Sequence, residues 1–250
     1  MKRFYSMLLQ LTFGLLTALL SITSAFSCQK DSSIAKIVKT LDFEITGKGN
    51  SNNWDEADWI ILTKQESSGV RKNSTQVKLL YSDRGIYFLF HCDDEKITAT
   101  LEEDFASLFK EDVVEVFLWP DQSVPVYFEY ELSPLNYELP ILIPNINGRI
   151  HGWRPMRYEG SNKVQHATSA EGGEKKSHAT IKGWRAEFFI PFTLLRPLIG
   201  ESPKSGSKWR ANLYRIDYDE GYDTWTWQKT SRGKPGNFHE YEKFGTFVFE

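Results

Sequence analysis

Three tryptophans in polar surroundings are the side chains of this sequence best suited to bind a ligand. Trp153 lies between Gly152 and Arg154, and Trp225 and Trp227 lie in an Asp-Thr-Trp-Thr-Trp segment. An exposed indole ring stacks on the apolar C–H face of a sugar ring, while polar neighbours bind the sugar's hydroxyls. A tryptophan packed beneath a loop would have the same local sequence. The three residues are therefore candidate platforms for a sugar, with burial as the alternative.

Closely spaced carboxylates raise the question of glycoside hydrolysis. That reaction needs two carboxyl groups about 5–10 Å apart across a cleft. Glu129 and Glu131 would lie on one face of a strand, about 6.5–7 Å apart. Acidic runs at 93–95 and 102–104 are typical of solvated turns. The sequence has no Gly-x-Ser-x-Gly segment and no phosphate-binding glycine loop, so it favours binding over catalysis.

Histidines and cysteines show no pattern of a metal or redox centre. The five histidines lack a close ligand spacing such as His-Glu-x-x-His, and we predict no metal site. Of the two cysteines, Cys92 alternates with apolar residues, which indicates a buried small side chain and no disulfide. The histidines are His91, His151, His166, His178 and His239.

Short alternating strands must position these side chains. In 125–132 and 208–216 every second residue is suited to a core, which leaves polar and aromatic residues on the opposite faces. These outward faces combine carboxylate, guanidinium, amide and aromatic groups, as a surface for hydroxyl-rich ligands would; an ordinary solvated sheet face is the alternative. The outward set comprises Tyr127, Glu129, Glu131, Arg210, Asn212 and Tyr214, and Glu115 is placed with Val113, Phe117 and Trp119.

The fold class follows from the number of such strands. Strands are predicted at 77–81, 86–92, 113–119, 125–132, 184–190, 208–216 and 244–249, with weaker candidates at 41–45, 97–101, 148–153 and 178–182. Short helical turns are predicted after Asp104 and from Pro191, and 159–178 is predicted to be a long hairpin loop. We therefore expect an all-β fold, a single antiparallel β-sandwich with one or two short helices.

Composition narrows the class of partner. The chain has 250 residues, of which 40% are hydrophobic and 25% charged, which excludes a disordered, collagen-like or coiled-coil protein. This length suits one large domain. The net charge of −3 argues against nucleic acid as a partner, because electrostatic binding to phosphates needs clustered basic residues.

The N-terminus has the pattern of an export signal. Lys2 and Arg3 precede an apolar stretch at 7–20 that is too short to span a bilayer. The segment ending at Cys28 resembles a bacterial lipobox, and the three residues after it resemble a surface-export tag. We predict a lipoprotein signal peptide at 1–27, acylation of Cys28, a tether at 28–40 and a β-sandwich at 41–250. The protein would then be an outer-membrane lipoprotein on the cell surface or the periplasmic side; cleavage near Ala25 to a periplasmic product is the alternative.

An ordered set of segments resembles the family 9 carbohydrate-binding modules over about residues 40–250, and most closely their standalone lipoproteins. The matching segments are Trp54 with Ala57-Asp58-Trp59, Gln76-Val77-Lys78-Leu79-Leu80-Tyr81, Gly85-Ile86-Tyr87, Asp112-Val113-Val114-Glu115-Val116-Phe117, Tyr127-Phe128-Glu129-Tyr130-Glu131, Glu187-Phe188-Phe189-Ile190-Pro191, Trp209-Arg210-Ala211-Asn212 and Asn237-Phe238-His239 with Phe244-Gly245.

The resemblance implies a DOMON-like sandwich that binds saccharides and does not cleave them. In modules appended to xylanases two tryptophans clamp a sugar; the later one matches Trp225 and Trp227, and the earlier one falls where this chain has Phe105 and Phe109. Glu115 matches a carboxylate that binds the sugar. Members can bind structural calcium, although no ligand set is matched here. Adding the residues singled out above, we predict a carbohydrate site formed by Trp225, Trp227, Trp153, Phe109, Glu115, Arg210 and Asn212.

We therefore predict a non-catalytic carbohydrate-binding lipoprotein with an oligo- or polysaccharide partner. It would support polysaccharide catabolism beside glycan-degrading enzymes or transport components, and contact the membrane only through its lipid. Two alternatives stay open. DOMON-like domains include haem-binding electron-transfer modules with Met and His ligands, for which Met156, His151 and His166 are the candidates. The other alternative is a protein-interaction subunit of a surface complex.

Overall fold

The computed structural model describes residues 32–66, 73–147, 149–231 and 237–250. The predicted signal peptide at 1–27, the acylated Cys28 and the first part of the tether lie outside the described residues. In the described part of the chain no helix has the length and apolar character that a membrane span requires.

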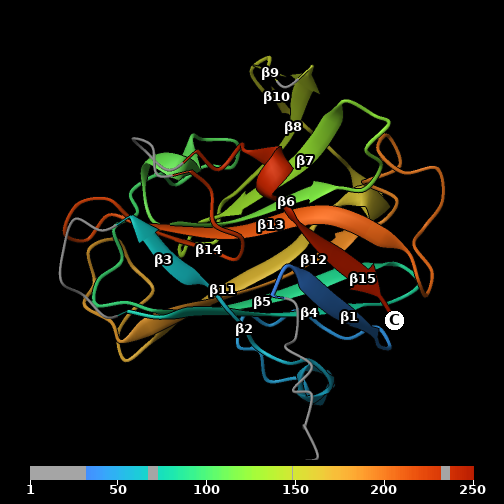
Figure 1. Ribbon diagram of the computed structural model, residues 1–250. Helices are drawn as coiled ribbons and strands as arrows, with labels where there is room; N and C mark the ends of the chain where they lie inside the picture. Colours follow the sequence, from blue (N-terminus) through green and yellow to red (C-terminus); the bar gives the residue numbers. More distant parts are fainter. Residues whose placement is uncertain (1–31, 67–72, 148, 232–236) are drawn as a thin grey trace, which may run out of the picture. The chain divides into compact units, whose positions relative to one another are not determined.

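The strands form two layers joined by the first strand (Figure 1). β1 (Ile34–Lys39) runs parallel to β15 along residues 34–37 and then parallel to β4 at residues 38–39, so that it bridges both sheets. The first sheet has the order β10 (Arg154–Pro155), β8 (Glu138–Ile146), β7 (Val126–Leu132), β6 (Val113–Trp119), β13 (Lys208–Asp217) and β15 (Gly245–Phe249). The second has the order β4 (Thr75–Tyr81), β5 (Gly85–Asp93), β12 (Gly183–Pro191) and β11 (Gln165–Glu171).

Short elements complete both sheets. β14 pairs with β13 and β3, β2 pairs with β4, and β9 pairs with β8. Their bounds are β2 (Ile60–Ile61), β3 (Thr63–Glu66), β9 (Arg149–Ile150) and β14 (Asp223–Thr226). The helical elements described are single 3-10 turns: η1 (Asn52–Glu56), η2 (Leu108–Lys110), η3 (Gly160–Asn162) and η4 (Tyr241–Lys243).

The main core fills the space between the layers. Val114, Val116 and Leu118 of β6 face it from the first sheet, and Phe88 and Phe188 face it from the second with their rings stacked 5.0 Å apart. The alternation predicted for 125–132 and 208–216 is confirmed, because Phe128, Tyr130, Leu132, Trp209, Ala211 and Leu213 all lie in this core.

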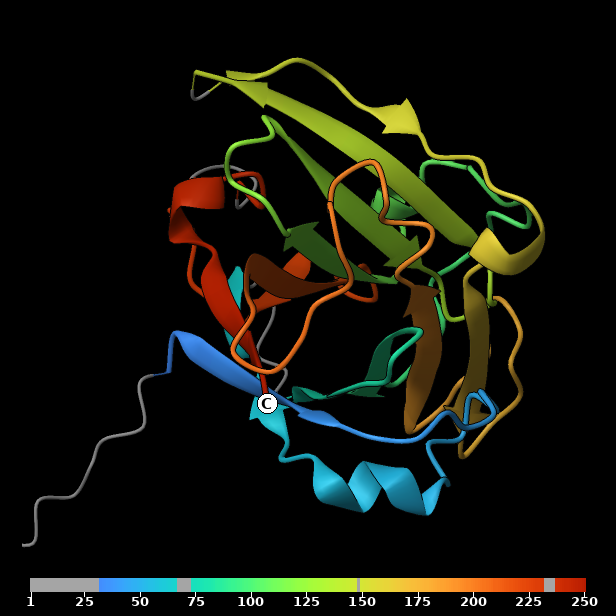
Figure 2. The same ribbon diagram turned by 90° about the vertical axis from the view of Figure 1, so that its right-hand side faces the viewer.

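Loops cover the outer faces of both sheets. The turn η1 lies on the outside of the second sheet (Figure 2). Its Trp54 packs there with Tyr87 and Phe189. On the outside of the first sheet, Phe238 and Phe244 pack over the strands. All seven residues of β6 are therefore buried, including those on the face predicted to point outward.

The strongest strand predictions are confirmed, and the predicted tether is wrong from residue 34 onward. Ala35 and Ile37 of β1 enter the core, because the Ile-Ala-Lys-Ile-Val-Lys segment alternates as a strand does.

The predicted loop at 159–178 contains β11, an edge strand, whose exposed position explains its polar sequence. β8 was not predicted because it contains Pro140 and Pro144, which cannot donate to a ladder; its outer neighbours are the two-residue strands β9 and β10.

Most of the weaker strand candidates do not form strands. Segments 41–45 and 97–101 are not strands, and 178–182 contributes one isolated bridge, between Thr180 and Lys96. Segment 148–153 overlaps the short β9. The turn predicted after Asp104 is the 3-10 turn η2, whereas the segment from Pro191 forms hydrogen-bonded turns.

Candidate functional site

A cavity of about 710 Å³ lies on the outer face of the first sheet. Strands β6, β7, β8 and β13 form its floor, and the walls come from η2, the segment between β9 and β10, the loop after β13 and the segment before η4. The lining residues are Phe109, Lys110, Glu115, Phe117, Glu129, Glu131, Ile141, Ile143, Trp153, Ile216, Tyr218, Tyr222, Asn237, Phe238 and His239. Its volume and its mixture of aromatic, aliphatic and few polar groups are those of small-molecule sites.

Three carboxyl groups share the floor of this cavity. Glu115 of β6 lies directly opposite Glu131 of β7, and Glu129 is the next residue of β7 on the same face. All three are at most 4% exposed. Glu129 Oε2 and both carboxyl oxygens of Glu131 accept no hydrogen bond from the described residues. A buried acceptor without a donor is costly, so these oxygens are suited to a ligand that supplies donors.

Burial and mutual repulsion make the three carboxyl groups weak acids. Burial raises the pKa of Glu129 to about 8. Burial raises the pKa of Glu115 well above its usual range, and the charge of Glu129 adds to the effect. The pKa of Glu131 rises for the same reasons, with burial first and then Glu115 and Glu129. Without a ligand, the cluster therefore retains protons near neutral pH.

Aromatic side chains form the walls. Trp153 is 42% exposed and Phe109 is 36% exposed, so each presents ring surface to a ligand. Tyr218 and Tyr222 contact each other edge to face, with ring centroids 5.4 Å apart. The Tyr218 hydroxyl donates to the Phe109 carbonyl oxygen at 3.2 Å, which links two walls of the cavity.

Buried polar residues fix the wall segments in place. The Asp112 carboxylate accepts from the Tyr218 amide at 2.8 Å and from the Thr98 amide at 2.5 Å, and so holds the loop after β13. The Tyr214 hydroxyl donates to the Phe238 carbonyl oxygen at 2.8 Å, and the two rings stack 4.0 Å apart. These contacts hold the segments that carry Tyr218 and His239.

His239 is a neutral hydrogen-bonding group of the wall. Its Nδ1 lies 2.6 Å from the Tyr127 hydroxyl, and its ring lies 5.3 Å from the ring of Phe117. Partial burial lowers the pKa of His239 from 6.5, so the imidazole carries no charge at pH 7. The positive charge that would offset the nearby carboxylates is therefore not supplied by this histidine.

The structure brings together three of the seven predicted carbohydrate-binding residues. Glu115, Phe109 and Trp153 all line the cavity, although they come from β6, η2 and the segment before β10. Sequence reasoning placed Glu129 and Glu131 on the face of Glu115 but did not include them in the site. Tyr218 and Tyr222 lie in a loop without periodicity, so no signal in the sequence pointed to them.

The prediction of Trp225 and Trp227 as exposed platforms is wrong, because both side chains belong to the main core. Trp225 is 1% exposed, and the Arg215 guanidinium lies 4.6 Å from its ring centroid. Trp227 is 9% exposed and packs against Gly245, where a Cβ atom would approach the indole to 2.4 Å. Their threonine neighbours are buried as well, so the polar local sequence gave no sign of burial.

Arg210 and Asn212 do not line the cavity either; they hold backbone. The Arg210 guanidinium donates to the carbonyl oxygens of Glu242, Phe244 and Gly245, and so fixes the end of η4. Asn212 is fully buried: its side chain donates to the Gln228 carbonyl oxygen and accepts from the Gln228 amide, both at 2.9 Å. Both side chains lie on the predicted face of β13. Their hydrogen-bonding groups, however, bind backbone groups of the segments that cover this face.

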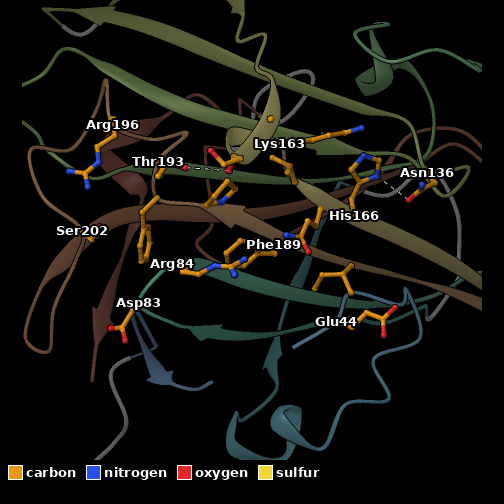
Figure 3. A pocket seen from close by; sticks show the side chains of 17 residues that line it. Glu44, Asp83, Arg84, Asn136, Lys163, His166, Phe189, Thr193, Arg196 and Ser202 are labelled. Atoms are coloured by element: carbon orange, nitrogen blue, oxygen red, sulfur yellow. Dashed lines mark hydrogen bonds between the residues drawn. The ribbon is translucent and has the colours of Figure 1, made fainter. Parts of the chain in front are cut away.

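A larger cavity of about 1020 Å³ lies beside β12 and η3, and Figure 3 shows its lining. Several of its polar groups already have partners within the protein. His166 Nδ1 lies 3.1 Å from Asn136 Oδ1, Arg196 donates to the Gly200 carbonyl oxygen at 3.1 Å, and Arg84 pairs with Asp42 at 3.3 Å. Among the described residues it contains no buried polar atom that lacks a partner. We therefore place the candidate site in the smaller cavity.

One group of three neighbouring carboxylates among the described residues is a candidate for a calcium ion. Asp94, Asp217 and Asp219 bring carboxylate oxygens within 4.8 Å of one another, and such oxygens are calcium ligands. The buried Arg215 guanidinium, however, bridges Asp94 at 2.9 Å and Asp217 at 2.7 Å, and the Trp184 indole donates to Asp94 at 3.1 Å. An internal cation thus pairs with two of the three carboxylates, and we assign the cluster an ion-pair role instead of a calcium site.

Comparison with known proteins agrees with the fold. A Bacteroides uniformis structure described as a carbohydrate-binding protein superposes with a TM-score of 0.70 at 16% identity, covering 87% of this chain and 99% of that one. A family 9 carbohydrate-binding module from Caldicellulosiruptor kristjanssonii superposes with TM-scores of 0.58 in its cellotriose complex and 0.59 in its glucose complex, both at 14% identity. The two complexes cover 86% and 87% of this chain, and 94% and 95% of the module.

The family assignment comes from the sequence. No curated protein sequence matches the chain significantly. The family model described as "Carbohydrate family 9 binding domain-like" matches residues 45–250, nearly the whole sandwich. The chain therefore belongs to the carbohydrate family 9 binding domain-like family.

Proposed function

We propose that the protein binds a saccharide in the cavity on the first sheet and does not cleave it. The observation that carries this proposal is the pairing of exposed aromatic rings, Trp153 and Phe109, with buried carboxyl oxygens that lack donors. Rings of this kind stack on the apolar face of a sugar, and sugar hydroxyls supply the donors that the carboxyl groups need. The family assignment supports it, as do the structural neighbours solved with cellotriose and glucose.

The carboxyl groups are poorly arranged for hydrolysis. Glycosidases place an acid and a second carboxylate on opposite sides of the scissile bond. Here Glu115, Glu129 and Glu131 all rise from the floor, on two adjacent strands. A sugar lying over them would meet all three from one side, which favours binding over bond cleavage.

The test is a titration of the protein with mono- and oligosaccharides, including glucose and cellotriose, by calorimetry. Trp153→Ala should weaken binding about two- to tenfold, because a stacking contact with an aromatic ring contributes about 0.5–1.5 kcal/mol and 1.4 kcal/mol is tenfold in Kd. Trp59→Ala is the matched control: Trp59 is 38% exposed but lies against Lys78 of the second sheet, away from the cavity. Equal loss in both variants, or no loss with Trp153→Ala, would contradict the proposal.

We further propose that the protein is an exported lipoprotein that supports polysaccharide catabolism beside glycan-degrading enzymes or transport components. The support is the signal-like N-terminus ending at Cys28 and the saccharide-binding family of the domain. Because β1 begins at Ile34, any tether between Cys28 and the sandwich would be short. Protease treatment of intact cells distinguishes a surface location from the periplasmic side.

A further inference from the structure

The candidate cavity contains many hydrogen-bond acceptors and few donors. Its floor carries three carboxyl groups, whereas the described lining side chains with nitrogen donors are Lys110, Asn237, His239 and the Trp153 indole. Lys110 is exposed, with its Nζ 5.9 Å from the ring centroid of Phe109. No ion pair joins Lys110 to a floor carboxylate within the described part of the chain.

Among the described residues, His239 is the basic side chain that pairs with a floor carboxyl group, with its Nδ1 3.9 Å from Glu129 Oε2. Its hydrogen bond with Tyr127 and its lowered pKa leave it neutral at pH 7. Among the described residues, the negative charge that the floor can develop has no internal cation as a partner. The contrast with Asp94 and Asp217 is direct, because there Arg215 supplies that cation.

Aromatic rings surround the same carboxyl groups. Trp153, Phe109, Tyr218 and Tyr222 form the walls, and Phe117 lies beside Glu129 on the floor. Ring faces attract cations, most strongly where water is excluded. Buried carboxylates beneath a set of aromatic rings are therefore complementary to an ammonium group, which has three donors and a positive charge.

We propose that the sugar unit bound in this cavity carries a protonated primary amine, as an unacetylated amino sugar does. The inference rests on the proposed function and adds the chemical class of the ligand. The ammonium lies over Glu129 and Glu131 and donates to their unpartnered oxygens, while the ring of the sugar stacks against Trp153 or Phe109. Binding ionises carboxyl groups that hold protons in the empty cavity, and these protons pass to solvent.

An acetylated or acidic sugar is less complementary to the floor of the cavity than an amino sugar. Acetylation removes the charge and two of the donors of the amine, and adds a carbonyl acceptor where the cavity already has too many. A uronic acid brings a negative charge and further acceptors to a floor of acidic groups for which the described residues supply no cation, and it does not provide the positive charge that the floor favours. The cavity thus favours an amine over both modifications of the same ring.

The experiment compares glucosamine, glucose and N-acetylglucosamine by calorimetry with the full chain at pH 6.5. This pH lies below the pKa of an amine with polar neighbours, about 7.7–8.0 for an α-amino group. We expect the Kd of glucosamine to be at least tenfold lower than that of glucose, and N-acetylglucosamine to bind no better than glucose. The β-1,4-linked disaccharides of the three sugars provide a second set with the same contrast.

The variant Glu129→Gln/Glu131→Gln tests the assignment to the floor. Glutamine keeps the shape of a protonated carboxyl group, so the variant should fold, which a thermal melt checks. The preference for glucosamine over glucose should fall to less than threefold. The control is Glu44→Gln, an exposed residue of the other cavity, which should keep the full preference.

The outcomes separate the two proposals. Equal affinity for glucosamine and glucose, or a preference for the acetylated sugar, overturns the amine inference and leaves saccharide binding in place. An undiminished amine preference in the double variant overturns the assignment to Glu129 and Glu131. Absence of binding to every sugar by the folded protein overturns the proposed function itself.

Discussion

Replacing Trp225 with alanine should destabilise the sandwich instead of removing an exposed sugar platform. The indole is 1% exposed in the main core, and two cations lie near its ring, with Arg215 at 4.6 Å and Lys64 at 5.0 Å from the centroid. Its Nε1 donates to the Asn73 carbonyl oxygen at 3.2 Å. Alanine removes all of these contacts and leaves a cavity beside a buried guanidinium.

The expected cost is about 3–5 kcal/mol, which is the usual range for a buried tryptophan or phenylalanine replaced by alanine. Since a domain is stable by only about 5–15 kcal/mol, this loss is a fifth or more of the total. The exposed Trp153 is the matched comparison. Trp153→Ala should change the free energy of unfolding by no more than about 0.5 kcal/mol, because surface substitutions outside packed cores have small effects.

Urea unfolding followed by circular dichroism measures both variants under the same conditions. The structure predicts a much lower midpoint for Trp225→Ala and a wild-type midpoint for Trp153→Ala, with sugar binding weakened only in the latter while both remain folded. If Trp225→Ala kept the wild-type midpoint and lost sugar binding, the burial of this ring and the choice of cavity would both be refuted.

Three further predictions follow from the buried charges and the N-terminus. Because the pKa of Glu129 is raised to about 8 from 4.5, this group binds more protons in the folded protein than in the unfolded chain. The free energy of unfolding should therefore fall as pH rises from about 7.5 to 8.5, a window above the pKa of about 6.5 of an unfolded histidine. Glu129→Gln should reduce this slope in urea titrations, and an unchanged slope would speak against it. Arg215→Met leaves Asp94 and Asp217 buried without their cation and should cost about 3–5 kcal/mol. That loss should be larger at pH 8 than at pH 5, since the two carboxyl groups can take up protons at low pH, and a loss independent of pH would contradict the ion-pair assignment. Cys28→Ala should abolish labelling of the protein by palmitate in growing cells, and labelling of the variant would exclude this cysteine as the acylated residue.

Alternation along strands predicted the fold and the floor of the site, because it depends only on the two-residue period of a strand. It placed Glu115 on one face of β6, and it placed Glu129 and Glu131 on the same side of β7, where the structure has them. Alternation does not reveal what covers a face. Phe238 and Phe244 lie over 100 residues from β6 in sequence, and their packing over the first sheet made an apparently outward face a buried one.

The tryptophans also show that local sequence does not predict burial. The polar neighbours of Trp225 are themselves buried, because β14 pairs with both β13 and β3 and is enclosed by them. Trp153 has similar neighbours but lies between the two-residue strands β9 and β10, at the margin of the sheet, and stays exposed. Whether each tryptophan is an exposed platform or part of the core depends on pairing between distant strands, which the local sequence does not encode.

The central claim is that a saccharide binds on the outer face of the first sheet. A crystal structure of the protein with a bound oligosaccharide tests it most directly. The account predicts a sugar ring against Trp153 or Phe109, with its polar groups within hydrogen-bond distance of Glu115, Glu129 or Glu131. A sugar in the cavity lined by Arg84, Lys163 and Arg196, with the first cavity empty, would contradict it.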